Sequence, residues 1–112
     1  MKIERNWQGS FLVLGLTGEL DAETAPDFEA AADKLIEEGA RFVVLDMSKL
    51  AFISSAGLRA VLVLGKGLRA VQGEVRFAAL QKTVAEVFDI AGFSRLFGVF
   101  PDVGAALAKT GM

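Results

Sequence analysis

The sequence of 112 residues contains no cysteine and no histidine. Without cysteine the chain can form no disulfide bond and offers no thiol nucleophile, and without either residue it lacks the usual ligands of a zinc site. The absence of histidine also removes the most common general base of enzyme active sites. We therefore expect this chain to have no metal site, no cofactor and no enzymatic activity.

Other catalytic and nucleotide-binding signatures are missing as well. The glycine-containing segments 15–18 and 65–67 do not match a phosphate-binding fingerprint, and no P-loop pattern follows a predicted strand. The acidic residues show no spacing typical of an acid/base pair, and most of them fall on the solvent-exposed faces of predicted helices. Lys49 and Lys66 have no spacing that would make either one the base for a serine nucleophile.

The chain also lacks concentrated positive charge and long apolar runs. Its net charge is −2 and its basic residues are scattered, so we do not expect it to bind nucleic acid. No apolar run approaches the roughly 20 residues that cross a bilayer, so no membrane-spanning segment is expected. The N-terminal segment lacks the apolar centre of a signal peptide. These features favour a protein of the cytoplasm.

What the chain does have is a high apolar content, 53% of its residues, including nine phenylalanines and one tryptophan. A chain of this length is long enough to bury a core as a single domain. The aromatic content predicts either a dense core or some exposed apolar surface that binds a partner.

The strand signals begin with a hairpin. Residues 2–8 and 11–16 are predicted strands joined at Gly9-Ser10, a turn signal, and Ile3 and Trp7 anchor the first strand in the core. The apolar run that follows the first helix indicates a strand buried on both faces. This run and two later segments complete the predicted strands, at residues 42–47, 75–80 and 97–100.

The first helix is predicted between these strands. Asp21 or Thr24 can cap it, Pro26 fits its first turn, and Gly39 ends it. Its core-facing side chains recur at helical spacing. They are Phe28, Ala31, Ala32, Leu35 and Ile36.

A later helix opens at Thr83, which has the spacing of a capping box with Glu86, and ends at Gly92. Its inward side chains are predicted to be Val84, Val87, Phe88 and Ala91. A short terminal helix covers residues 103–109. Together the elements predict an α/β fold, with a mixed four- to five-stranded β-sheet packed by about four α-helices. The domain is expected to span residues 1–112.

The most informative segment, residues 43–68, runs from a buried strand through two adjacent serines into a helix. Ser54 and Ser55 precede Ala56 and Gly57, and apolar side chains then recur at helical spacing. The core-facing positions of this helix are Leu58, Val61, Leu62, Gly65 and Leu68, and the positions off this face are Arg59, Lys66 and Arg69.

A serine at a helix N-terminus has two possible roles. The commoner is to cap the helix with its hydroxyl. The other is to carry a phosphate, because a helix N-terminus presents unpaired N–H groups and a partial positive charge that tolerate an added anion. The small residues Ala56 and Gly57 leave a flat surface beside the hydroxyls, which favours close approach by a partner. From the residues alone both roles remain open.

Two motifs resemble those of a known family. The segment Leu45-Asp46-Met47-Ser48, followed by Phe52-Ile53-Ser54-Ser55-Ala56-Gly57-Leu58, resembles the signature of anti-sigma factor antagonists, the bacterial members of the STAS domain family. That signature reads roughly L-D-L-S, then F-[IM]-[DS]-S-[STA]-G-L. The earlier Leu16-Thr17-Gly18-Glu19-Leu20-Asp21 resembles the family's L-x-G-E-L-D segment. The spacing of the two motifs and the chain length also match.

The resemblance implies roles for particular residues. Ser55 matches the phosphoacceptor serine of the family, with Ser54 as the second candidate. Ser54 stands where the family often has Asp, and Ala56 stands where Ser or Thr is frequent. Asp21 matches an acidic position that helps engage the partner kinase. The implied partner-binding residues are Asp21, Ser54, Ala56, Gly57 and Arg59.

The function that the resemblance implies is partner switching. The unmodified protein would bind an anti-sigma factor that is also a serine kinase, releasing a sigma factor. Phosphorylation of Ser55 would end that binding, and a metal-dependent serine phosphatase of the PP2C type would restore it. The helix from Ser55 to Arg69 would supply the rest of the interface, with Arg59 and Lys66 as candidates for charge complementarity.

Two alternatives stay open. One is a STAS accessory subunit that docks on a transport ATPase through the same serine loop without needing phosphorylation. The other is a module that senses a small ligand bound by the sheet. We expect a monomer or weak dimer, because an exposed sheet edge or the apolar segment 93–100 would allow two copies to associate.

Overall fold

The computed structural model describes residues 1–108, which form one mixed β-sheet packed by helices. The strands lie in the order β1-β2-β3-β4-β5; β1 runs antiparallel to β2, and the other pairs are parallel. The elements in chain order are β1 (Lys2–Gln8), β2 (Phe11–Leu20), α1 (Ala25–Glu37), β3 (Phe42–Ile53), α2 (Ser55–Ala70), β4 (Glu74–Ala78), α3 (Lys82–Ile90), α4 (Phe93–Leu96), β5 (Gly98–Phe100) and α5 (Val103–Ala108). The predicted fold class is confirmed.

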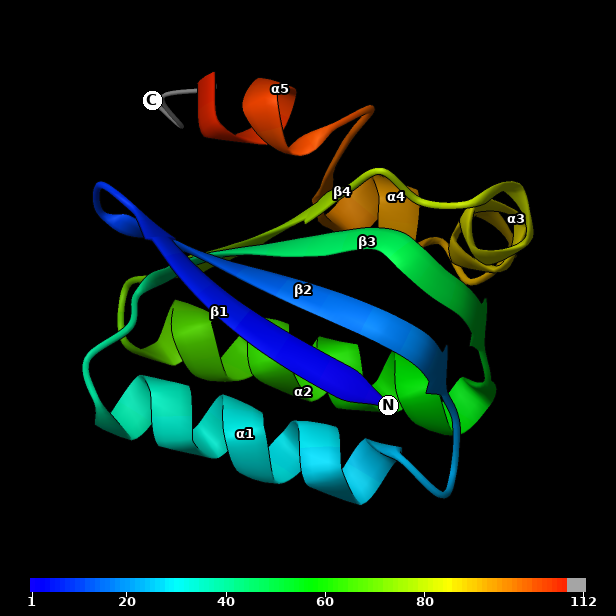
Figure 1. The fold of residues 1–112 in the computed structure, drawn as a ribbon, viewed down its shortest axis with the longest axis horizontal. Helices are drawn as coiled ribbons and strands as arrows, with labels where there is room; N and C mark the ends of the chain where they lie inside the picture. The colour runs from blue at the N-terminus through cyan, green and yellow to red at the C-terminus, as the bar shows by residue number, and fades with distance from the viewer. Residues whose placement is uncertain (109–112) are drawn as a thin grey trace.

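The sheet lies between two unequal layers of helices (Figure 1). Helices α1 and α2 lie side by side against one face, and α5 lies against the opposite face. Val43, Leu45 and Met47 of β3 join the main core, whereas Val44 joins a smaller cluster beneath α5. Both faces of β3 are therefore buried, as its continuous apolar sequence predicts.

The hairpin and the first helix follow their sequence signals closely. Gly9 has a φ of +63°, which suits the two-residue turn between Gln8 and Phe11. Gly39 has a φ of +100° just beyond the end of α1, and the predicted core face of α1 packs inward. Trp7 is the exception, because its side chain is 54% exposed and does not anchor β1.

The side-chain caps predicted for α1 and α3 do not form. Thr24 occupies the N-cap position of α1, but neither it nor Asp21 makes a side-chain cap hydrogen bond to the helix. Helix α3 begins at Lys82, so Thr83 lies inside it, and its hydroxyl donates to the carbonyl of Ala51 at 3.3 Å. A tertiary contact has thus taken the hydroxyl that the capping box would use.

Other elements also differ from the prediction. Strand β3 continues beyond Met47 to Ile53, because β2 also continues and pairs with it. Helix α4, a single turn, was not predicted, and Ala91 is exposed where an inward side chain was expected. The predicted last residue of the terminal helix, Lys109, lies outside the described residues. No helix within residues 1–108 is long and apolar enough to cross a bilayer.

The outer hairpin strand is tied to α1 by an ion pair. The Arg5 guanidinium donates to the Glu38 carboxylate, with Nη2 and Oε1 2.6 Å apart. This hydrogen bond holds the pKa of Glu38 below its usual value. Both side chains are partly exposed, so the contact orients the strand more than it stabilises the fold.

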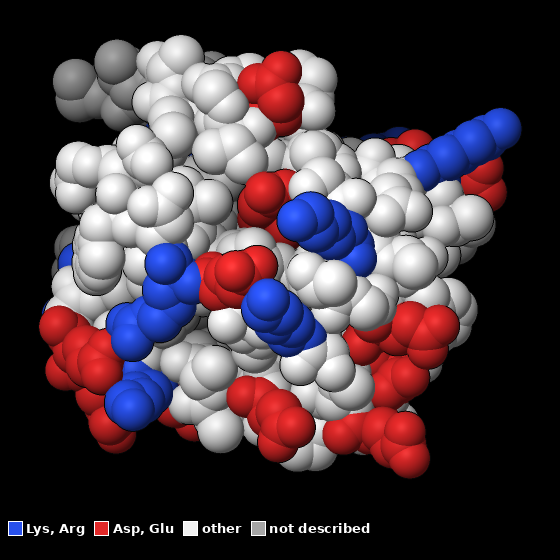
Figure 2. All heavy atoms as spheres, viewed as in Figure 1, with Lys and Arg blue, Asp and Glu red and all other residues white. Residues whose placement is uncertain are grey.

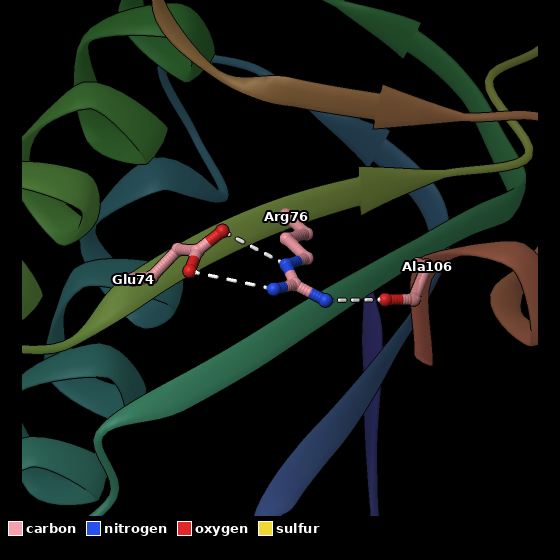
Figure 3. Close-up of polar contacts among 3 residues, drawn as sticks. All are labelled: Glu74, Arg76 and Ala106. Atoms are coloured by element: carbon pink, nitrogen blue, oxygen red, sulfur yellow. Dashed lines mark hydrogen bonds and ion pairs between the residues drawn. The ribbon is translucent and has the colours of Figure 1, made fainter. Parts of the chain in front are cut away.

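One buried cation, Arg76 of β4, fastens α5 to the sheet (Figure 3). Arg76 is 1% exposed, and within the described chain it is the only buried charged residue. Its Nη1 donates to the Ala106 carbonyl at 2.6 Å, and its Nε donates to Glu74 Oε2 at 2.8 Å. The guanidinium also lies 4.8 Å from the ring centroid of Phe11. The burial of this charge is therefore matched by several partners.

We expect Arg76→Met to loosen α5 selectively. The substitution keeps an unbranched side chain but removes the donor to Ala106, and a hydrogen bond to a charged group contributes about 1.5–3 kcal/mol. Urea unfolding should show a loss of that order, and amide exchange in α5 should accelerate most. Arg95→Met, at an exposed position, is the control and should change stability by less than about 0.5 kcal/mol. Unchanged exchange in α5 would show that Arg76 does not hold the helix.

Candidate functional site

The serine pair lies where β2 and β3 end together. These strands are parallel, and their last residues, Leu20 and Ile53, are paired in register. The backbone N–H of Ser54 donates to the Leu20 carbonyl at 3.0 Å. This brings the loop after β2, which begins at Asp21, beside the loop after β3. The carboxyl ends of parallel strands are a common place for binding sites in α/β folds.

The two serines have different surroundings. Ser54 is the N-cap of α2, with extended backbone, and its hydroxyl oxygen accepts a hydrogen bond from the Gly57 N–H at 3.2 Å. Ser55 is the first residue of the helix and is exposed, and its hydroxyl has no hydrogen-bond partner among residues 1–108. The capping role and the free hydroxyl therefore belong to different side chains.

Gly57 sets how closely α2 approaches the sheet. It is buried, and a Cβ atom at this position would lie 2.4 Å from the Leu20 carbonyl oxygen and 2.8 Å from Ile53 Cγ1. No real Cβ atom tolerates these distances, so a larger residue would push the first turn away from β2. Gly57 shapes the site through packing and exposes little surface of its own.

The electrostatics of this helix end suit an anion. The first turn of α2 contains no acidic side chain that would already compensate the partial positive charge of the helix N-terminus. The partial positive charge of the helix N-terminus would therefore favour a phosphate on Ser55. Within residues 1–108 no group of three or more histidine, cysteine or acidic residues is placed to hold a metal.

Asp21 organises the neighbouring loop. Its Oδ1 accepts hydrogen bonds from the backbone N–H groups of Glu23 at 3.0 Å and Thr24 at 3.1 Å. The Thr24 hydroxyl in turn donates to the Glu19 carbonyl at 2.8 Å. Asp21 is half-buried, so its carboxylate is held in a defined position at the same edge of the sheet as the serines.

The remaining predicted residues lie along the start of α2, with Ala56 half-buried and Arg59 exposed one turn after Ser55. Phe52 belongs to the family motif but was not predicted as a site residue; its side chain is 47% exposed near the end of β3, two residues before Ser54. Its exposure depends on the extension of β3, which the sequence pattern did not predict. An exposed aromatic side chain beside the serines is typical of a protein-binding surface.

Comparison with known proteins identifies the family of the chain. The STAS domain matches residues 2–106 of the chain. The chain belongs to the STAS domain family. It is 41% identical over 108 residues to BtrV of Bordetella bronchiseptica, a protein named for an expected role as an anti-sigma factor antagonist, and the match covers 96% of this chain and 93% of BtrV.

Two solved structures share the fold of this STAS domain. The unphosphorylated form of the anti-sigma factor antagonist SpoIIAA is 24% identical with a TM-score of 0.82, covering 95% of this chain and 93% of that one. The phosphorylated form of the Bacillus SpoIIAA is 23% identical with a TM-score of 0.74, covering 95% and 96%. At these identities the likeness establishes the fold.

We expect Gly57→Ala to destabilise this STAS domain. The added methyl group would clash with backbone and a buried side chain, and overpacking of this kind costs about 1–3 kcal/mol. Gly67→Ala, in the same helix, is the matched control, because its Cβ would meet only the flexible tip of Ile36 at 3.0 Å. The control should be neutral or up to about 1 kcal/mol more stable. Equal effects of the two changes in thermal unfolding would contradict the packing role of Gly57.

The division between the serines predicts unequal effects of two alanine substitutions on stability. Ser54→Ala removes the N-cap hydrogen bond and should lower the free energy of unfolding by about 1 kcal/mol. Ser55→Ala removes an exposed hydroxyl without a partner and should change it by less than about 0.5 kcal/mol. Denaturant unfolding of both variants measures the difference. A larger loss for Ser55→Ala would mean that Ser55 is the structural serine.

Proposed function

We propose that this STAS domain, taken as residues 1–112, is an anti-sigma factor antagonist switched by phosphorylation of Ser55. The observation that carries the proposal is the exposed Ser55 hydroxyl at an uncompensated helix N-terminus, with the capping role already filled by Ser54. The relation to BtrV supports the role, and the solved phosphorylated form of SpoIIAA supports phosphorylation on this fold. The accessory-subunit and ligand-sensing alternatives are not better supported.

The chain acts as a binding protein and as the substrate of its partner's kinase activity. The unmodified surface around Ser55 binds an anti-sigma factor with serine kinase activity and thereby frees the sigma factor. The kinase then transfers the γ-phosphoryl group of magnesium-bound ATP. The Ser55 oxygen bonds to phosphorus, the bond to the β-phosphate oxygen breaks, ADP leaves, and the hydroxyl proton passes to a base of the kinase. A PP2C-type phosphatase hydrolyses the phosphoserine and restores the binding surface.

The switch is electrostatic and local. Phosphorylation adds about 1.5–2 negative charges at neutral pH. In the free domain the helix N-terminus offsets this by about 0.3–1 kcal/mol, so the fold survives the modification. In a complex, the same charge must be desolvated against the partner and lies at the sheet edge that carries Glu19 and Asp21. The complex is therefore lost while the domain stays folded.

Phosphorylation by the candidate anti-sigma factor kinase, with ATP and magnesium, tests the proposal. Peptide mass spectrometry should place the phosphate on Ser55, and Ser55→Ala should accept none and stay bound. Ser55→Asp should bind the kinase at least about tenfold more weakly, a difference of about 1.4 kcal/mol. Ser48→Ala, at an exposed serine of β3, is the control and should behave as the unsubstituted protein.

Two results would overturn parts of this proposal. Phosphate on Ser54 in place of Ser55 would keep the switch and reassign the acceptor. A stable complex with an ATPase and no phosphate transfer would favour the accessory-subunit alternative.

A further inference from the structure

Helix α2 carries a row of positive charge that begins one turn after Ser55. Arg59, Lys66 and Arg69, together with Leu62, follow Ser55 in steps of three or four residues and so share one face of the helix. We call Arg59, Lys66 and Arg69 the cationic ridge. All three are exposed, and within residues 1–108 none forms a salt bridge. Helix α2 contains no acidic residue.

An apolar groove lies beside the cationic ridge. It has a volume of about 140 Å³ and lies between α2 and the end of α4 with the residue that follows it. Its lining residues are Leu62, Gly65, Lys66, Arg69, Leu96 and Phe97. Gly65 allows this arrangement, because a Cβ there would lie 2.7 Å from the Phe97 ring. Leu96, at the rim, is 61% exposed, so an apolar side chain stands in water beside two cations.

The charge of the cationic ridge is opposite in sign to the net charge of the protein. The net charge of the chain is −2, and the neighbouring helix α1 carries Asp27, Glu29, Asp33 and Glu37 with Lys34 as its only basic residue. Figure 2 shows the acidic side chains gathered along the lower edge of the view, over α1. Helix α2, which begins with the candidate phosphoacceptor, therefore differs from α1 in carrying three basic residues and no acidic one.

We propose that the cationic ridge and the groove bind an acidic amphipathic helix of the anti-sigma factor, an inference that rests on the proposed function. Carboxylates of the bound segment would face Arg59, Lys66 and Arg69, and one of its apolar side chains would enter the groove between Leu62 and Leu96. At 1.5 Å per residue, the ridge extends about 15 Å along α2, roughly three helical turns of a bound segment. Contact over this length extends the Ser55 interface along the whole helix.

The physical argument is complementarity of both charge and apolarity. Leu96 is exposed and flanked by cations that form no salt bridge within the described part of the chain. A segment with both carboxylates and an apolar side chain stabilises this surface more than water or a purely apolar surface does. Such charges accelerate association and select the partner, and their contribution falls as salt screens them. A nucleic acid fits less well, since three cations in a net acidic protein provide little counterion release.

A first experiment needs no natural partner. The full chain labelled with ¹⁵N is titrated with a short synthetic helix-forming peptide that has glutamates and leucines on one face, and separately with the same peptide carrying glutamine for glutamate. We expect amide shifts at Arg59, Lys66, Arg69 and Leu96, reversed by high salt, and at least tenfold weaker binding of the glutamine peptide. Shifts elsewhere, or equal binding of both peptides, would overturn the proposal.

A second experiment uses charge reversal and the anti-sigma factor kinase. The double substitution Lys66→Glu with Arg69→Glu should weaken binding at least tenfold. The matched control, Lys34→Glu with Lys82→Glu, makes the same change in net charge at exposed positions outside the cationic ridge and should bind within about threefold of the unsubstituted chain. Circular dichroism and unfolding curves confirm that both variants fold.

The outcomes separate the two proposals. If Ser55 is phosphorylated and the two charge-reversed variants bind equally, the proposed role of the cationic ridge is overturned and the proposed switch stands. No phosphorylation and no complex defeats the proposed function, and the peptide titration then decides the ridge alone. Two other results would assign this surface to another occupant and overturn the proposal. One is tighter binding of a DNA oligonucleotide than of the acidic peptide. The other is concentration-dependent self-association that charge reversal at the cationic ridge abolishes.

Discussion

The contact on which the site depends is the approach of the first turn of α2 to the end of β2. Parallel pairing of β2 with β3 brings Leu20 level with Ile53, and the Leu20 carbonyl then receives the Ser54 N–H. The helix starts this close only because Gly57 has no side chain to meet that carbonyl. A backbone contact between the end of β2 and the N-cap of α2 thus sets the position of both serines and of the loop that begins at Asp21.

Under the proposed function, this arrangement would separate structural stability from regulation. Ser54 is committed to the helix cap, so the neighbouring hydroxyl of Ser55 is free to be modified without loss of a hydrogen bond. The helix N-terminus tolerates the added charge in the free domain, whereas a partner pressed against it would have to desolvate that charge. In the proposed switch, phosphorylation of one side chain would therefore control binding with little change in the fold. The cationic ridge would extend this surface along the outside of the same helix.

Much of the fold could be predicted because local signals agreed with tertiary packing. The turn at Gly9, the stop at Gly39 and the core face of α1 follow from backbone conformation and helical spacing. Predictions failed where a distant contact intervened. Thr83 does not cap α3 because the helix begins before it, and its hydroxyl donates to Ala51 instead. Trp7 remains exposed although its strand position suggested burial. The burial of Arg76 could not be predicted, since nothing in the sequence around an arginine in a short strand indicates that a later helix will cover it.

The sequence by itself determined the fold class, the order of most elements, the family resemblance and the serine pair at a helix N-terminus, because each depends on residues close together in the chain. Only the tertiary structure decided which serine caps the helix and which is free, since that depends on the exact start of α2 against β2. It also decided that Phe52 and Leu96 are exposed and that Arg76 is buried. Burial depends on all the elements packed around a residue, so it cannot be predicted from the local periodicity of the sequence.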